Sequence, residues 1–238
     1  MTAVLVQITD CHVVRGPGGE AAAAALEQVV AGIVALPIPP AAVLLSGDIV
    51  HEGDADDYAF VHELLSPVTS PVYAIPGNHD DPALVHGAFG NPGEAEVAGL
   101  RMVLCDTHVA GTDAGHLDLD ALAARLAGDE RPTLVAMHHP PLRTGIPAID
   151  ALALPMDERT GLAELLAASP QVVRVVCGHV HRITFETLGG CGVFTCPATW
   201  EQLEPGPEFG SLAFVERGRA FAIHTWIDGV LVTQIQPV

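Results

Sequence analysis

Apolar residues are distributed in two alternating patterns over the first three quarters of the chain. Short uninterrupted apolar runs are typical of strands buried on both faces. Between them, apolar residues recur every three or four positions, which is typical of amphipathic helices. The runs predict strands at residues 3–9, 41–46, 71–76, 100–106, 133–137 and 172–177. The periodic stretches predict helices at residues 20–36, 55–65, 82–89, 118–126 and 158–168.

The pattern changes after residue 182, where helical periodicity stops. Short apolar runs separated by turn residues predict strands at residues 183–188, 193–196, 212–215, 220–225 and 230–236. A first part in which strands and helices alternate, followed by a shorter part that is mostly strand, fits two packed sheets with helices outside. No repeat or low-complexity linker interrupts the chain, so we expect one α/β domain over residues 1–238. Residues 143–155 show no period, and we expect a loop that forms a wall of the site.

Composition and charge limit the classes of partner. Hydrophobic residues make up 49% of the chain and the mean hydropathy is +0.37, which indicates a packed interior rather than disorder. The formal net charge is −19. An acidic chain lacks the basic surface of a non-specific nucleic-acid binder, so we expect no nucleic-acid polymer as partner. An anionic substrate stays compatible with this charge, because divalent cations in a site dominate the local field.

The start of the chain and its cysteines bear on location. Residues 1–8 are apolar but lack the charged start of a signal peptide, and no stretch is long enough to span a bilayer. We therefore expect a cytoplasmic protein with no membrane span. Five cysteines, an odd number, lie at mostly apolar positions, which favours free thiols. A Cys191–Cys196 link across a turn is the alternative. The oligomeric state stays open, with a homodimer among the alternatives.

Five motifs rich in metal-binding residue types come directly after predicted strands. In chain order they are Asp10-Cys11-His12, Gly47-Asp48, Gly77-Asn78-His79-Asp80, His138-His139-Pro140 and Gly178-His179-Val180-His181. Ligands in α/β proteins gather outside the carboxyl ends of parallel strands, so we expect these side chains to meet at one edge. If the strand conformation continues through residues 10–12 and 179–181, a spacing of two places both ligands of each motif on one face.

The residue types indicate which metals would bind. Two carboxylates, four imidazoles and one amide oxygen form a borderline ligand set that suits Mn, Fe, Zn or Co better than calcium. Two divalent ions against two carboxylates leave the site net positive. Such a site binds a phosphodiester and lowers the pKa of a water molecule. The motifs therefore predict two metal ions and hydrolysis of phosphate esters.

The ordered set of motifs resembles the calcineurin-like metallophosphoesterase superfamily over residues 10–181. The resemblance implies a four-layer αββα sandwich, with two mixed sheets flanked by helices. It also implies seven ligands in two sets: Asp10, His12 and His181 for one metal, Asn78, His138 and His179 for the other, and Asp48 as the bridge. His138 is preferred to His139 because it comes first after its strand.

The resemblance further implies two catalytic residues beside Asn78. His79 would stabilise the transition state and protonate the leaving oxygen, a role that suits an imidazole near neutral pH. Asp80 would orient His79 or a ligand. Within the superfamily, the 77–80 motif, the His138-His139-Pro140-Pro141 run and the compact length are similar to class III cyclic nucleotide phosphodiesterases, and bacterial glycerophosphodiesterases share these motifs.

The expected substrate is therefore a small phosphodiester. A cyclic nucleotide (3′,5′-cAMP or 2′,3′-cAMP) is the first choice. A glycerophosphodiester or another small ester is the alternative, because the motif residues hold metal and phosphate and do not distinguish one leaving group from another. A binding scaffold without activity, like the retromer subunit that resembles these enzymes, is disfavoured because no ligand is missing.

The remaining histidines carry weaker signals. We interpret His224 as a core residue. The sequence favours a solvated position over a ligand role for four others: His51, His62, His86 and His116. The roles of His108 and Arg143 stay open.

Overall fold

The strands of the described residues form three β-sheets. The structure, a computed structural model, describes residues 3–205, 212–216 and 218–238. The five-stranded sheet contains, in spatial order, β13 (Val230–Pro237), β12 (Ala220–Ile227), β1 (Ala3–Ile8), β2 (Ala42–Ser46) and β3 (Val72–Ile75). The six-stranded sheet contains β4 (Glu94–Val97), β5 (Leu100–Leu104), β6 (Thr133–Ala136), β7 (Val172–Cys177), β9 (Cys191–Thr195) and β8 (Thr184–Leu188). A separate hairpin pairs β10 (Gln202–Pro205) with β11 (Leu212–Val215).

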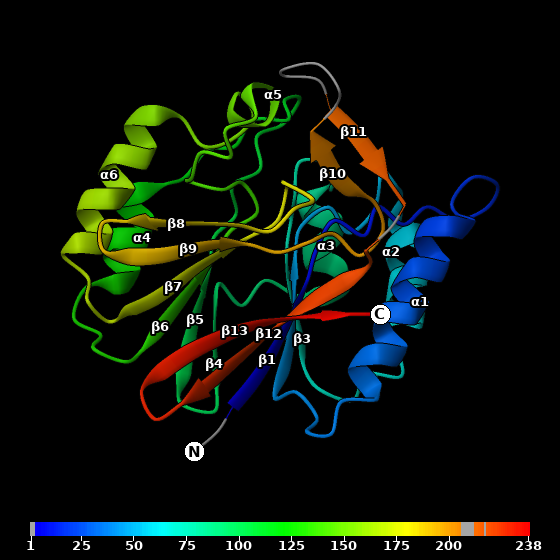
Figure 1. Ribbon diagram of the computed structural model, residues 1–238, viewed down its shortest axis with the longest axis horizontal. Helices are drawn as coiled ribbons and strands as arrows, with labels where there is room; N and C mark the ends of the chain where they lie inside the picture. The colour runs from blue at the N-terminus through cyan, green and yellow to red at the C-terminus, as the bar shows by residue number, and fades with distance from the viewer. Residues whose placement is uncertain (1–2, 206–211, 217) are drawn as a thin grey trace.

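The two large sheets pack face to face, and helices cover their outer faces (Figure 1). On one side lie α1 (Glu20–Val34), α2 (Ala55–Leu64) and α3 (Pro82–Phe89), and on the other α4 (Leu119–Leu126) and α6 (Met156–Ala167). Buried side chains from both sheets, among them Leu44, Met102 and Val176, form a core between them. Each sheet contains both parallel and antiparallel strand pairs. The expected αββα architecture is confirmed.

Capping side chains lie at the starts of α2 and α3. Asp54 accepts hydrogen bonds from the backbone N–H groups of Asp56 and Asp57, and the Asp57 carboxylate accepts the N–H of Asp54 in return. The helix after Asp81 begins with Pro82, whose missing N–H would have no partner in a first turn. Each cap of this kind stabilises its helix by about 1 kcal/mol.

Three short elements were missing from the sequence prediction: β4, β10 and α5 (Pro147–Asp150). β4 reads Glu-Ala-Glu-Val and is an edge strand, so its apolar pattern is weak. α5 lies within residues 143–155, predicted as loop, and has only four residues. Such short segments are stabilised by tertiary contacts, because isolated helices of this length do not form.

Two further expectations concern cysteines and membrane spans. All five cysteines are free thiols and buried, so the alternative Cys191–Cys196 link is not formed. Across the described ranges, none of the helices combines the length and the apolar character that crossing a bilayer requires.

Candidate metal centre

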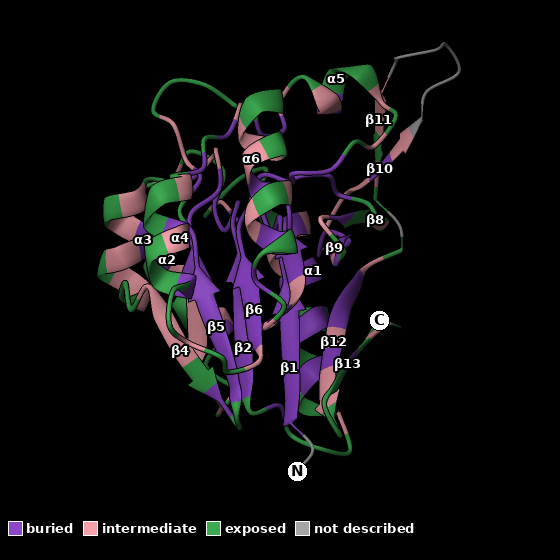
Figure 2. Ribbon diagram, turned by 90° about the vertical axis from the view of Figure 1, so that its left-hand side faces the viewer, coloured by how far each residue is buried: buried purple, intermediate pink, exposed green. Residues whose placement is uncertain are grey.

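Five parallel strands carry the metal-binding motifs to one edge of the packed sheets. β1, β2 and β3 run parallel in one sheet, and β6 and β7 run parallel in the other. The loops that follow them lie largely buried above the strand ends (Figure 2). The predicted convergence of the motifs is therefore what the fold produces.

The local backbone differs from the expected strand continuation. β1 ends at Ile8, and the two ligand pairs that follow β1 and β7 have left-handed backbone: φ is 51° for Asp10, 46° for His12, 69° for His179 and 50° for His181. Asp48 has φ of 51° as well. Non-glycine residues in this region cost about 1–3 kcal/mol each. The prediction of extended spacing was wrong, because tight left-handed turns rather than a pleat aim these side chains at the site.

The first half of the site combines residues from both sheets. Nε2 of His12 lies 3.1 Å from Nε2 of His181 and 3.6 Å from Oδ2 of Asp48. Nε2 of His181 lies 3.5 Å from Oδ1 of Asp10. One ligand atom from each of these four residues falls within 4.8 Å of the others.

The second half shares the carboxylate of Asp48. Oδ1 of Asn78 lies 3.1 Å from Nε2 of His138 and 3.0 Å from Nδ1 of His179. Nε2 of His138 in turn lies 3.4 Å from Oδ2 of Asp48. Asp48 is therefore the residue common to both halves, the position expected for a bridge.

The chemistry of these atoms fits cations. Nδ1 of His138 donates to the carbonyl oxygen of Ser46 at 2.8 Å, so a neutral His138 directs the lone pair of Nε2 at oxygens of Asn78 and Asp48. Nδ1 of His181 likewise donates to the carbonyl of Glu201 at 2.7 Å. Acceptor atoms that face one another repel unless a proton or a metal ion lies between them. The residues present therefore suit two metal ions.

The pKa values of the site residues also indicate that the site favours bound positive charge. Burial lowers the pKa of His138, but Asp48, Asp10 and the hydrogen bond to Ser46 together outweigh burial and raise that pKa to about 9. Burial raises the pKa of Asp48, yet His138, His12 and His79 together hold it well below its ordinary value. Burial lowers the pKa of His12 to about 3, which keeps its lone pair free. Asp48 is therefore ionised and ready to accept cations.

Two motif glycines are required by close approach. A Cβ added to Gly77 would lie 2.1 Å from Oδ1 of Asp48. Gly47 has φ of 96°, and its added Cβ would lie 2.3 Å from Nδ1 of His138. Side chains at these positions would push the ligands apart, which explains why glycine precedes Asp48 and Asn78.

His79 lies at the open side of the site. Its backbone N–H donates to Oδ1 of Asp48 at 2.9 Å, and its half-buried ring meets the ring of His12 edge-on with centroids 5.0 Å apart. His79 therefore lies beside both Asp48 and His12.

Asp80 lies behind the site rather than in it. Its buried carboxylate accepts the backbone N–H groups of Ile49, Val50 and Gly77 and the hydroxyl of Tyr58. These contacts tie together the loops that carry Asp48 and Asn78. Asp80 therefore holds the backbone of the 48–50 and 77–80 segments together.

Three other histidines differ in their surroundings. His139 engages both ring nitrogens, with Thr107 Oγ1 at 2.8 Å and the carbonyl of Asp113 at 3.2 Å, and burial lowers its pKa to about 3. It is a packed residue, and its neighbour His138 faces the ligands. His224 is fully buried in the core, as interpreted from the sequence. His51 was interpreted as solvated; it is exposed, but its ring contacts two site histidines.

Two elements that the sequence did not predict, α5 and β10, pack against the last motif. Ile149 of α5 and Leu203 of β10 pack on Val180, between the two ligands of the last motif. The backbone N–H of Leu203 donates to the carbonyl of His181 at 2.9 Å. Both α5 and the hairpin lie at the end of the molecule where the ligand loops gather (Figure 1). Of the two residues left open, His108 is half-buried and Arg143 is exposed.

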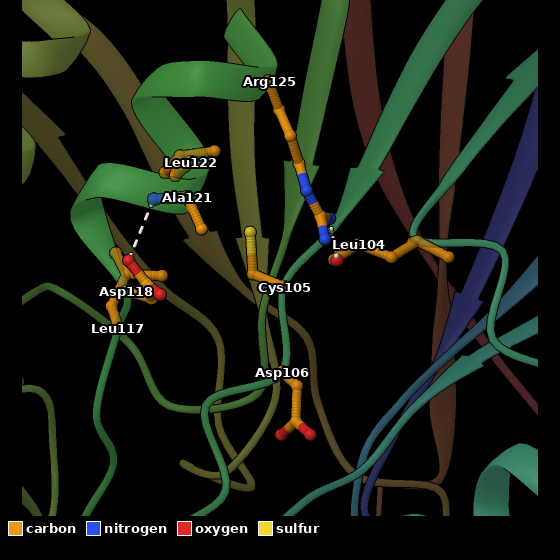
Figure 3. A pocket seen from close by; sticks show the side chains of 8 residues that line it. All are labelled: Leu104, Cys105, Asp106, Leu117, Asp118, Ala121, Leu122 and Arg125. Atoms are coloured by element: carbon orange, nitrogen blue, oxygen red, sulfur yellow. Dashed lines mark hydrogen bonds between the residues drawn. The ribbon is translucent and has the colours of Figure 1, made fainter.

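A separate cavity of about 210 Å³ lies at the end of β5 against α4 (Figure 3). Leu104, Cys105 and Asp106 line it from one side and Arg125 from the other. Burial raises the pKa of the Cys105 thiol to about 12, so the thiol is unreactive at neutral pH. The cavity shares no lining residue with the metal centre.

Together, an αββα sandwich and an Asp/His/Asn cluster at its strand ends define a metal-dependent phosphoesterase. The chain belongs to the calcineurin-like phosphoesterase family, whose model matches residues 3–182.

The sequence relatives are named either as glycerophosphodiester phosphodiesterases or as cyclic nucleotide phosphodiesterases. A glycerophosphodiester phosphodiesterase of Enterobacter lignolyticus is 35% identical over 181 residues, which cover 69% of this chain and 64% of that enzyme. A 3′,5′-cyclic adenosine monophosphate phosphodiesterase of Pseudomonas aeruginosa is 30% identical over 99% of this chain and 90% of its own length. A probable cyclic nucleotide phosphodiesterase of Synechococcus is 31% identical over 86% and 83%.

Similar solved structures agree on the fold. A dimetal phosphatase from Danio rerio has a TM-score of 0.75 at 14% identity and covers 99% of this chain and 96% of its own. A purple acid phosphatase from yellow lupin has a TM-score of 0.69 at 15% identity and covers 100% of this chain and 52% of its own.

Proposed function

We propose that residues 1–238 act as one metallophosphoesterase domain that hydrolyses cyclic nucleotides such as 3′,5′-cAMP or 2′,3′-cAMP. The observation that carries this choice is the near full-length similarity to the phosphodiesterase of Pseudomonas aeruginosa, whose name states 3′,5′-cyclic adenosine monophosphate as its substrate.

The ligand assignment follows the geometry of the two halves. Asp10, His12 and His181 would hold one metal and Asn78, His138 and His179 the other, with Asp48 shared. Mn, Fe, Zn or Co in these positions would polarise the phosphate and activate water for attack.

The residues of this chain then have distinct tasks. Asp48 fixes His79 through its backbone N–H, which keeps the ring next to the shared carboxylate. From there the imidazole of His79 would donate a proton to the leaving oxygen. Asp80 keeps the two ligand loops in register through their backbone amides.

A glycerophosphodiesterase activity is the second candidate. The relative at 35% identity carries that name, and its alignment covers less than two thirds of its length. The motif residues do not distinguish one leaving group from another, so specificity must come from elements around the site, such as α5 and the β10–β11 hairpin.

A substrate panel tests the proposal. The protein is loaded with Mn²⁺, and kcat/KM is compared for 3′,5′-cAMP, 2′,3′-cAMP, glycerophosphocholine and bis(p-nitrophenyl) phosphate, because specificity is the ratio of these values. We expect the highest value for a cyclic nucleotide. Preference for glycerophosphocholine would support the second candidate. Two bound metals without hydrolysis of any ester would indicate a scaffold.

A further inference from the structure

The ring of His51 touches two site residues that the fold brings to it from different loops. Nδ1 of His51 lies 3.2 Å from Nδ1 of His12. The rings of His51 and His79 are stacked, with centroids 4.5 Å apart and planes inclined by 25°. One exposed histidine therefore contacts a proposed ligand through a nitrogen and the proposed proton donor through its face.

The direction of the hydrogen bond follows from the ligand geometry. Nε2 of His12 faces His181 and Asp48 at 3.1 and 3.6 Å, so it is the nitrogen on the ligand side. A His12 that offers the Nε2 lone pair carries its proton on Nδ1. That proton then points at His51, whose Nδ1 accepts it.

We propose that His51 is a positioning residue of the metal centre: it accepts Nδ1–H of His12 to orient that ligand, and its ring fixes the plane of His79. The proposal rests on the ligand assignment above, but not on the identity of the ester.

Both contacts have expected consequences. Partners that accept the outer N–H of a ligating histidine fix its tautomer and ring orientation, and their loss weakens metal binding about 10- to 100-fold. Offset or stacked aromatic contacts contribute a smaller amount, equivalent to roughly two- to tenfold in an equilibrium constant. The hydrogen bond should therefore affect metal affinity. The stacking contact should affect kcat, because it orients the ring of His79.

Two substitutions separate the contacts. In His51→Asn, the short amide places an acceptor close to the position of Nδ1 but removes the ring. In His51→Phe, the ring stays and the acceptor is lost. His62→Asn is the matched control, since His62 is also exposed and lies on α2 near Phe89. His12→Ala identifies which step of a metal titration belongs to the first half of the site.

The experiment is a Mn²⁺ titration of chelator-treated full-length protein by calorimetry, followed by kcat and KM on bis(p-nitrophenyl) phosphate at saturating Mn²⁺. We expect His51→Phe to weaken, about 10- to 100-fold, the same binding step that His12→Ala abolishes, and to leave the other step unchanged. We expect His51→Asn to keep both affinities and to lower kcat roughly two- to tenfold with KM unchanged.

The outcomes are distinguishable. Wild-type affinity in His51→Phe would overturn the hydrogen-bond role, and wild-type kcat in His51→Asn would overturn the stacking role. A loss of both binding steps together with a lower thermal midpoint would show a structural role instead. If the wild-type protein itself bound no Mn²⁺, the ligand assignment would fail before His51 was tested.

Discussion

The carboxylate of Asp10 accepts the backbone N–H of His179, with both oxygens 3.1 Å from that nitrogen. Asp10 follows β1 of one sheet and His179 follows β7 of the other, 169 residues further along the chain. Burial raises the pKa of Asp10, and His181 and His138 oppose that rise. This contact joins the two sheets at the metal centre, so the site and the sandwich stabilise each other.

Asp48→Asn should be the most damaging single substitution in the site. The shared carboxylate lies beside His12 and His138, so its loss removes charge from both halves. We expect loss of both metals on measurement of metal content, and a fall in kcat/KM of roughly 10³-fold, which corresponds to about 4 kcal/mol. Asp120→Asn, at an exposed carboxylate in the first turn of α4, is the control. Retention of two metals by Asp48→Asn would contradict the bridging role.

Asn78 and His79 are adjacent but should differ in phenotype. Asn78→Ala removes an oxygen that lies about as near to His138 as to His179, so we expect one metal site to weaken. His79→Ala should keep both metals and lower kcat about 10²- to 10⁴-fold, the range typical of a lost general acid. Metal analysis alongside kinetics distinguishes the two. Equal metal loss in both variants would make His79 a ligand instead.

Asp80→Asn should destabilise the ligand loops without removing a group that contacts substrate. The carboxylate accepts three backbone N–H groups and the Tyr58 hydroxyl, and an amide presents an N–H group to one of these donors. We expect a loss of about 1–3 kcal/mol in the free energy of unfolding, against about 1 kcal/mol for Tyr58→Phe. Urea unfolding measures both values. Equal stability of Asp80→Asn and wild type would contradict a positioning role for Asp80.

Removal of metal should lower the thermal midpoint. The site places acceptor atoms against one another, and ligands that bind only the folded state stabilise it. At a free metal concentration 100 times the dissociation constant, the gain is about 2.7 kcal/mol for one site. Differential scanning calorimetry with and without chelator checks this, and Asp48→Asn should show a smaller shift than wild type. An unchanged midpoint in the wild-type protein would argue against tight binding.

His224 should make stability depend on pH away from the metal centre. Its Nε2 lies 3.0 Å from Oε1 of Gln7, and its Nδ1 lies 2.9 Å from the hydroxyl of Thr233. Gln7 also donates to the carbonyl of Cys177, which links the two sheets. Burial, with a smaller contribution from Arg174, lowers the pKa of His224 from 6.5 to about 3.

The direction in which stability changes with pH follows from proton binding. Below pH 6.5 the unfolded chain binds a proton at His224 that the folded chain rejects, so stability falls as pH falls from 6.5 towards 3. The slope for one such group approaches about 1.4 kcal/mol per pH unit. His224→Gln should flatten the profile of unfolding free energy between pH 4 and 6.5 relative to wild type. Parallel profiles would show that His224 is not the titrating group.

The sequence by itself determined the order of the main strands and helices and the residue types of the site. Apolar periodicity is a local property, so α3 and β7 were predicted with the bounds that the structure shows. The motif residues also follow strands directly, and parallel strands of a sandwich end at one edge, which made their convergence predictable. The short elements β4, β10 and α5 were missed because their local patterns are weak.

Only the tertiary structure decided how the site residues are aimed and which neighbours they have. Left-handed turns at Asp10 and His179 depend on contacts between sheets, and no periodicity in the sequence encodes them. His51 contacts His12, which lies 39 residues away, and Asp80 accepts from Val50, which lies 30 residues away. The sequence signal for a role of His51 was its position three residues after Asp48. Whether a histidine at that position faces solvent or a ligand depends on packing between distant segments.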